Sequence, residues 1–184
     1  DEVLNEKDLP IKYAGFSPCF RKEAGAAGRD TRGIVRIHQF NKVEQYIYCT
    51  PEQSDEMHEH LLNNLCEVME DLELPYRVIE ACTGDMGFNK VKMHDVEAWF
   101  PSEGTYRELG SCSSIGQFQA RRTNTRFRAT DGSLQFCATL NNTGIALPRA
   151  IVPVIENHQN PDGSVNIPKC LQPLMGGRTK IGGK

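Results

Sequence analysis

The sequence lacks several features by which large classes of protein are known. No apolar run approaches the roughly 18 residues that a membrane-spanning helix needs, so we expect no membrane partner. The first stretch, DEVLNEKDLPIKY, contains neither a basic nor an apolar segment and is not expected to be a signal peptide. A net charge of -3 argues against a surface that is basic all over and coats nucleic acid.

Paired cysteines are also missing. The seven cysteines include no CxxC pair, and their number is odd. This pattern disfavours a disulfide framework and a zinc site, and it favours reduced thiols in the cytoplasm or in an organelle matrix. Several cysteines stand in strand-like runs such as YIYCT and LQFCATL, where we expect them to pack as small core residues.

The glycine-rich loops that commonly hold nucleotide phosphates are absent as well. Neither GxGxxG nor GxxxxGK followed by serine or threonine occurs. A nucleotide bound by this protein would therefore have its phosphates held by side chains. The 184 residues are enough for one domain, or for a large piece of one.

What the sequence does contain is a series of strand-like segments. Runs of β-branched and aromatic residues predict strands over residues 11–20, 34–49, 76–81, 91–100, 105–112, 122–128 and 133–140. A helix start at Thr50 to Gln53 predicts a helix to about Glu73, and a second helix is predicted over residues 145–158. Together these elements predict an α+β fold with an antiparallel sheet flanked by helices. His58 and His60 are predicted to be surface residues of the first helix and not metal ligands.

The residues around the first two predicted strands combine positive charge with an aromatic ring. Arg21 and Glu23 share a face at the end of the first strand, and Arg36, Phe40 and Glu44 share a face of the second. Arginine forks match phosphate oxygens, and a phenyl ring can stack on a purine. If the strands pair, this surface suits a nucleoside triphosphate. A solvated hairpin with cross-strand ion pairs is the alternative.

Two later segments add polar groups of the same kind. Glu108 and Ser111, in TYRELGSCSS, lie near the predicted end of a strand and offer oxygen ligands suited to Mg²⁺ on phosphates. In TLNNTGIALPR, a strand ends in small polar residues and a helix that bears Arg149 begins. An arginine at such a turn can reach a phosphate or cover a purine.

These segments together resemble the seryl-tRNA synthetases, which are class II aminoacyl-tRNA synthetases. SPCFRKEAGAAGRDTRGIVRIHQFNKVEQ is similar to motif 2 of the family and TLNNTGIALPRAIVPVIENHQ to motif 3. ACTGDMGF, TYRELGSCSSIGQFQARRTNTRF and IPKCLQPLMGG occur in the family's order. The resemblance runs from about Leu9 to Gly177.

The resemblance implies a partial class II catalytic domain. Residues 1–184 would form the part that carries motifs 2 and 3, whereas the tRNA-binding helical arm, motif 1 and the Thr-x-Glu segment find no counterpart. A homodimer is implied for the parent protein. Gly110 stands where the family usually has serine, and Asn142 where it usually has glycine, so Asn142 would have to tolerate any positive φ there.

The resemblance also implies an ATP site. Arg21 would hold the α-phosphate and stabilise the charge that develops during adenylation. Phe40 would stack on one face of the adenine, and Arg149 would cover the other face and touch the γ-phosphate. The remaining residues of this implied site are Glu23 for the adenine amino group, Arg36 for the outer phosphates, and Glu108 and Ser111 for Mg²⁺.

Two further sites follow from the same resemblance. Glu44, Asn141 and Thr143 would line a serine pocket, with Glu44 accepting a hydrogen bond from the substrate hydroxyl. The loop from Ala24 to Gly33, with Arg29 and Arg32, would touch the acceptor end of serine tRNA.

The implied activity is ATP-dependent activation of serine to seryl-adenylate, followed by transfer to serine tRNA. Two alternatives remain open at the level of the sequence. The chain could belong to a synthetase-like ligase that charges a carrier protein, because such relatives also lack the tRNA-binding arm. It could also belong to a non-catalytic paralogue, although Arg21, Glu108 and Arg149 are all retained.

Overall fold

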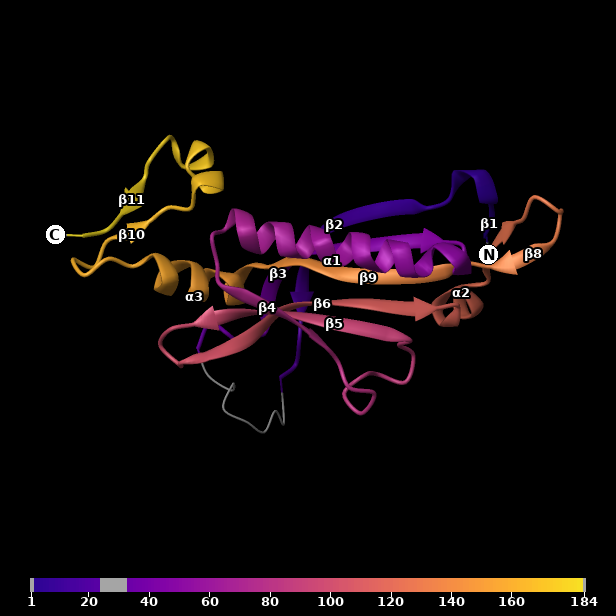
Figure 1. Cartoon of the computed structure of the whole chain (residues 1–184), viewed down its shortest axis with the longest axis horizontal. Coiled ribbons are helices and arrows are strands. Elements are labelled where there is room, and N and C mark those ends of the chain that lie inside the picture. The colour runs from indigo at the N-terminus through magenta and orange to yellow at the C-terminus, as the bar shows by residue number, and fades with distance from the viewer. Residues whose placement is uncertain (1, 24–32, 184) are drawn as a thin grey trace.

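A six-stranded antiparallel sheet forms the body of the molecule (Figure 1). The computed structural model describes residues 2–23 and 33–183. Every neighbouring pair of strands in this sheet is antiparallel, which confirms the predicted α+β class. The spatial order is β2 (Ile11–Phe20), β3 (Gln39–Cys49), β9 (Ala138–Ala146), β6 (Thr105–Gly116), β5 (Lys92–Phe100) and β4 (Tyr76–Glu80).

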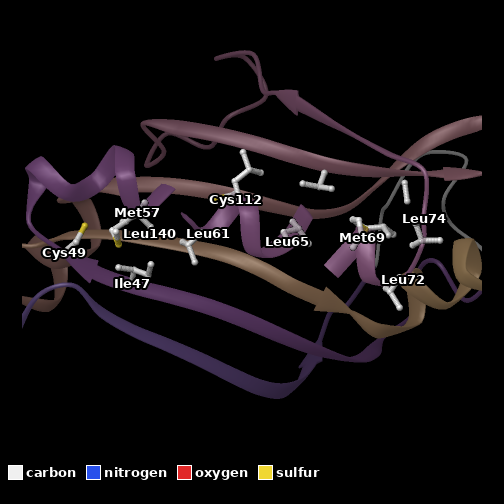
Figure 2. Close-up of a cluster of buried hydrophobic side chains, with 14 of the residues drawn as sticks. Ile47, Cys49, Met57, Leu61, Leu65, Met69, Leu72, Leu74, Cys112 and Leu140 are labelled. Atoms are coloured by element: carbon white, nitrogen blue, oxygen red, sulfur yellow. The ribbon is translucent and has the colours of Figure 1, made fainter. Parts of the chain in front are cut away.

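Helix α1 (Ser54–Asp71) packs along one face of the sheet. It begins after a single 3-10 turn, Pro51–Gln53, where the side chains of Thr50 and Gln53 form the reciprocal capping box that the sequence predicts. The apolar stripe of α1 lies on strands from the centre of the sheet (Figure 2). The buried side chains that it contributes are Met57, Leu61, Leu62, Leu65 and Met69, and the strands add Ile47, Cys49, Val96, Ala98, Phe100, Leu109, Cys112, Ala138 and Leu140.

Strand β9 is longer than predicted and passes directly into α3 (Leu147–His158). The small polar residues of TLNNTG suggested that the strand ends near Leu140 and that a helix begins at Ile145. Instead these residues continue the strand, because β9 hydrogen-bonds to β3 on one side and to β6 on the other. Pro148 lies in the first turn of α3 as predicted, and Pro153 lies inside the helix.

Smaller elements complete the described chain. β1 (Glu2–Asn5) pairs in parallel with β7 (Thr125–Arg128), which pairs with β8 (Leu134–Phe136) across the predicted Asp131-Gly132 turn. Helix α2 (Phe118–Thr123), which was not predicted, precedes β7. The predicted strand from Ile34 begins only at Gln39. The remaining pieces are 3-10 turns at Glu6–Asp8, Lys169–Leu171 and Pro173–Met175, and the two-residue strands β10 (Val165–Asn166) and β11 (Lys180–Ile181).

The cysteines behave as small core residues where strands carry them. Cys49, Cys112 and Cys137 are fully buried, and all seven cysteines are free. Within residues 2–23 and 33–183, no helix combines the length and the apolar character that crossing a membrane requires.

One histidine of α1 is buried, contrary to the prediction. His58 is 0% exposed, and its Nε2 lies 2.8 Å from Nδ1 of His94 on β5. Its acidic neighbours on α1 suggested a solvent-exposed residue, but position 58 follows the buried Met57 and faces the sheet. Only His60 is partly exposed. Burial lowers the pKa of His58 to about 4, with a smaller contribution from Lys92 and His94.

We expect this buried histidine to make the protein less stable as the pH falls from 6.5 towards 4. Below pH 6.5 the unfolded state binds a proton at His58, whereas the folded state does not until about pH 4. The folded-state pKa is therefore the lower one, and up to about 3 kcal/mol of stability is lost across this window. Urea unfolding of the wild type and of His58→Gln at several pH values measures the effect. A difference between the two that stays constant from pH 7 to pH 4 would contradict the assignment.

Candidate functional site

A cavity of about 510 Å³ lies where β2, β3, β6 and the start of α3 meet. Alternation along β9 explains its position. Leu140 packs in the core beneath α1, so its neighbour Asn141 points to the opposite face of the sheet. The α1 face is therefore apolar, and the other face carries the polar side chains that strand alternation leaves there.

The cavity brings together most of the residues that the sequence assigned to a site. Of the ten predicted site residues in the described part of the chain, eight line it: Arg21, Glu23, Arg36, Phe40, Glu108, Ser111, Thr143 and Arg149. These residues come from segments up to 128 positions apart, counted from Arg21 to Arg149. The predicted tRNA contacts Arg29 and Arg32 lie outside the described residues.

Arginine side chains lie on both sides of the cavity around one aromatic ring. The Arg21 guanidinium carbon lies 5.1 Å from the centre of the Phe40 ring, a cation–π contact between β3 and the end of β2. Arg149 reaches across from α3 and donates a hydrogen bond of 2.9 Å to the backbone carbonyl of Glu108. This bond fixes the guanidinium near β6, so the cavity offers two positive groups and a flat apolar surface.

Glu23 and Arg36 form an ion pair at the entrance to the cavity. The Nε of Arg36 lies 2.6 Å from Oε2 of Glu23, and the two side chains are 33% and 12% exposed. This is the cross-strand ion pair that the sequence left open as an alternative. It does not exclude a phosphate, because a guanidinium has five N–H donors and Nε uses only one of them.

Glu44 and Asn141 lie next to one another beside Thr143. Asn141 donates a hydrogen bond of 3.0 Å from Nδ2 to Oε1 of Glu44, and Glu44 pairs directly with Thr143 across β3 and β9. Lys42, which the sequence analysis did not single out, lies with Nζ 2.5 Å from Oε2 of Glu44. The group offers a carboxylate, an amide and a hydroxyl, which suits a small polar ligand.

Glu108 and Ser111 lie inside β6 and not near its end as predicted, because the strand continues to Gly116. Across from them, Asp95 of β5 pairs with Ser111 and was missed from the sequence. Burial raises the pKa of Asp95 to about 6, and the nearby Glu108 raises it further. The alternation of KMHDVEAWF could have revealed it, because Val96 and Ala98 face the core and Asp95 therefore faces the site.

The oxygen ligands here fit a Mg²⁺ ion only in part. Carboxylate and hydroxyl oxygens are the ligand type that Mg²⁺ prefers, and the ion usually takes one or two of them together with phosphates and water. Among the residues that the structure describes, no group of three His, Cys, Asp or Glu side chains is arranged to hold a metal. Glu108 and Ser111 can therefore supply two ligands, and a bound triphosphate would have to supply more.

The family departure at Asn142 has no backbone consequence. Positive φ among non-glycine residues of the described chain occurs at Glu23, Glu73 and Asn124, and not at Asn142. Asn142 is an ordinary strand residue that points towards α1, where its Nδ2 donates a hydrogen bond to the carbonyl of Leu61. Its Oδ1 is buried without a partner.

The raised pKa of Asp95 predicts that its charge destabilises the fold. At pH 7 the carboxylate is ionised although its surroundings favour the neutral form, so Asp95→Asn is expected to increase the free energy of unfolding by roughly 1–2 kcal/mol. The gain should disappear below about pH 3.8, where both states are protonated. Glu97→Gln is a matched control, because Glu97 accepts a hydrogen bond of 2.7 Å from Arg77 and should not become more stable without its charge. Urea unfolding at pH 7 tests this. A loss of stability in Asp95→Asn would contradict it.

Comparison with known proteins places the chain among tRNA synthetases. Residues 1–158 match the family model of the tRNA synthetase class II core domain (G, H, P, S and T). The serine–tRNA ligase of Bdellovibrio bacteriovorus is 52% identical over 181 residues, which are 98% of this chain and 42% of that protein. The serine–tRNA ligase of Deinococcus radiodurans is 54% identical over 183 residues, 98% of this chain and 43% of that protein.

Solved structures of the same enzyme share the fold. The seryl-tRNA synthetase of Pyrococcus horikoshii, complexed with ATP, superposes with a TM-score of 0.94 at 51% identity and covers 100% of this chain and 41% of that one. The cytoplasmic serine–tRNA ligase of Naegleria fowleri, in complex with AMP, has a TM-score of 0.92 at 41% identity, with 100% and 43% coverage. The chain thus spans less than half the length of the relatives that it matches.

Proposed function

The chain belongs to the family of class II tRNA synthetase core domains, and on this premise we propose that it activates serine with ATP and passes the seryl group to serine tRNA. The observation that carries the proposal is the meeting of Arg21, Phe40 and Arg149 around one cavity. The names of the relatives support serine as the amino acid, and the ATP and AMP complexes of two of them support an adenine nucleotide in the cavity.

The first step needs positioning and charge stabilisation more than proton transfer. The serine carboxylate attacks the α-phosphorus of ATP, an O–P bond forms, and the bond to the bridging oxygen breaks to release pyrophosphate. Arg21 holds the α-phosphate and stabilises the negative charge that develops there, and Arg36 and Arg149 hold the outer phosphates. Phe40 and Arg149 enclose the adenine between a ring and a guanidinium, and Glu23 accepts from its amino group. In the second step, a ribose hydroxyl of the terminal tRNA nucleotide takes the seryl group from AMP.

Mg²⁺, held by Glu108 and Ser111 and by the triphosphate, would neutralise phosphate charge in this site. The serine side chain lies against Glu44, Asn141 and Thr143, with Glu44 as the acceptor of its hydroxyl proton. Because Asn141 already donates to Glu44, the carboxylate is held in a defined orientation. A site built to bond a hydroxyl discriminates against analogues that lack it, since its polar groups would then be left unpaired.

The rest of the assignment concerns the whole protein. We assign residues 1–184 to the part of the catalytic core that carries motifs 2 and 3. The segment from Ala24 to Gly33, with Arg29 and Arg32, is assigned to the acceptor end of the tRNA. Formation of a homodimer and a cytoplasmic location complete the proposal.

Replacement of Arg21 tests the proposed chemistry. Wild-type protein is expected to catalyse ATP–pyrophosphate exchange only when serine is present, and Arg21→Ala is expected to lose at least about 100-fold in rate, because one preformed positive donor to developing charge is removed. The exposed Arg178 lies outside the cavity lining, so Arg178→Ala is the matched control and should retain activity. Far-UV circular dichroism checks that both variants fold.

The result of that assay also separates the alternatives. Exchange that is followed by seryl transfer to tRNA supports the proposal. Exchange without transfer to any serine tRNA would favour a ligase that charges a carrier protein. No exchange in the wild type would favour a non-catalytic paralogue.

Replacement of Phe40 tests the adenine site. Phe40→Ala removes the stacking surface and is expected to raise KM for ATP about 10-fold or more, since stacking on an aromatic ring contributes roughly 1–3 kcal/mol per base. KM for serine should change little. Phe40→Tyr keeps the ring and should stay near the wild type. Equal KM values for ATP in Phe40→Ala and Phe40→Tyr would show that the adenine binds elsewhere.

A further inference from the structure

Gly110 occupies a position in β6 that has no room for a side chain. A Cβ built there would lie 2.9 Å from Cβ of Thr143 and 3.0 Å from Cδ2 of Leu65, and 3.2 Å from Cγ2 of Thr143. Distances below 3.0 Å do not occur between a Cβ and its neighbours, so something would have to move. Gly110 does not have a positive φ, which means that space and not backbone conformation requires glycine.

The two neighbours differ in how easily they can move. Leu65 is 0% exposed and lies in the middle of the core beneath α1, where close packing leaves it nowhere to go. Thr143 is 5% exposed and lines the cavity, so it has open space on one side. An added side chain at position 110 would therefore push Thr143 towards the cavity.

Thr143 carries its methyl and hydroxyl groups on the same stiff Cβ. Because the branched side chain has few allowed rotamers, the packing of the methyl group decides the direction of the hydroxyl. The methyl carbon is among the atoms nearest to the space at Gly110. No hydrogen bond joins the Thr143 hydroxyl to another described residue, so packing against β6 is what orients this side chain.

We propose that Gly110 is a positioning residue for the amino-acid substrate: its missing side chain lets Thr143 pack against β6 and hold its hydroxyl at the serine pocket beside Glu44. The proposal rests on the proposed function and deepens it, because it assigns part of the serine affinity to a residue that cannot itself touch the substrate. The ATP half of the cavity is built from Arg21 and Phe40, which Gly110 does not contact.

The proposal predicts a split between the two substrates when Gly110 is changed. In serine-dependent ATP–pyrophosphate exchange, Gly110→Ala is expected to raise KM for serine about 10-fold or more, because small displacements of positioning groups have large effects. KM for ATP should stay within about twofold of the wild type, since the adenine and α-phosphate groups are undisturbed. Gly15→Ala is the control, because a Cβ at Gly15 meets nothing within 4 Å.

Two second-site variants distinguish positioning from a general loss of packing. Thr143→Ser removes the methyl carbon at 3.2 Å and keeps the hydroxyl, and Leu65→Val shortens the side chain whose Cδ2 lies at 3.0 Å. In the Gly110→Ala background, Thr143→Ser should recover part of the serine KM. Leu65→Val should recover thermal stability at most, and leave the serine KM raised.

Three results would overturn the inference. The serine KM of Gly110→Ala could stay within about twofold of the wild type, KM for ATP could rise as much as KM for serine, or Leu65→Val could restore the serine KM as well as Thr143→Ser does. Absence of exchange in the wild type is a different failure, since it removes the proposed function and the substrate role together. In that case a double-mutant cycle on thermal unfolding still decides whether Gly110→Ala and Thr143→Ser are coupled, as direct contact requires.

Discussion

The register of β9 between β3 and β6 is the constraint on which the rest of the structure depends. In this register Leu140 faces the core beneath α1, and Asn141 and Thr143 face the other side, next to Glu44 and Ser111. A shift by one residue would exchange the two sets and would bury amide and hydroxyl groups against leucine side chains. The same pairing therefore stabilises the core and assembles the site, which is why the polar sequence TLNNTG can persist as a central strand.

Charge in the cavity is arranged largely through protein–protein pairs. Arg36 pairs with Glu23, Lys42 with Glu44, and Arg149 with the carbonyl of Glu108. Such pairs hold long side chains in defined positions before a ligand arrives, and preorganised groups stabilise developing charge without a later cost of reorganisation. The arrangement also explains how a protein with a net charge of -3 offers a locally positive surface. Four arginines of the predicted site lie in or beside the first two strands, and the acidic residues are spread over the whole chain.

Local patterns predicted the elements well where the signal is local. The capping box of α1, its apolar stripe, the ends of β2 and the Asp131-Gly132 turn all follow from neighbouring residues. The errors arise where distant strands decide the outcome. The length of β9 depends on two partners, the burial of His58 depends on His94, and the role of Asp95 depends on its pairing with Ser111. The ten described site residues were found because they resemble a family, and the steric role of Gly110 required coordinates.

The central claim is that a purine nucleotide lies between Phe40 and Arg149, with its α-phosphate at Arg21. A crystal structure of the protein soaked with ATP and Mg²⁺ tests this claim most directly. The account predicts electron density for the adenine in contact with the Phe40 ring on one face and the Arg149 guanidinium on the other, and an α-phosphate oxygen within hydrogen-bonding distance of Arg21. Density for the adenine outside this cavity, or an α-phosphate that Arg21 does not reach, would contradict it.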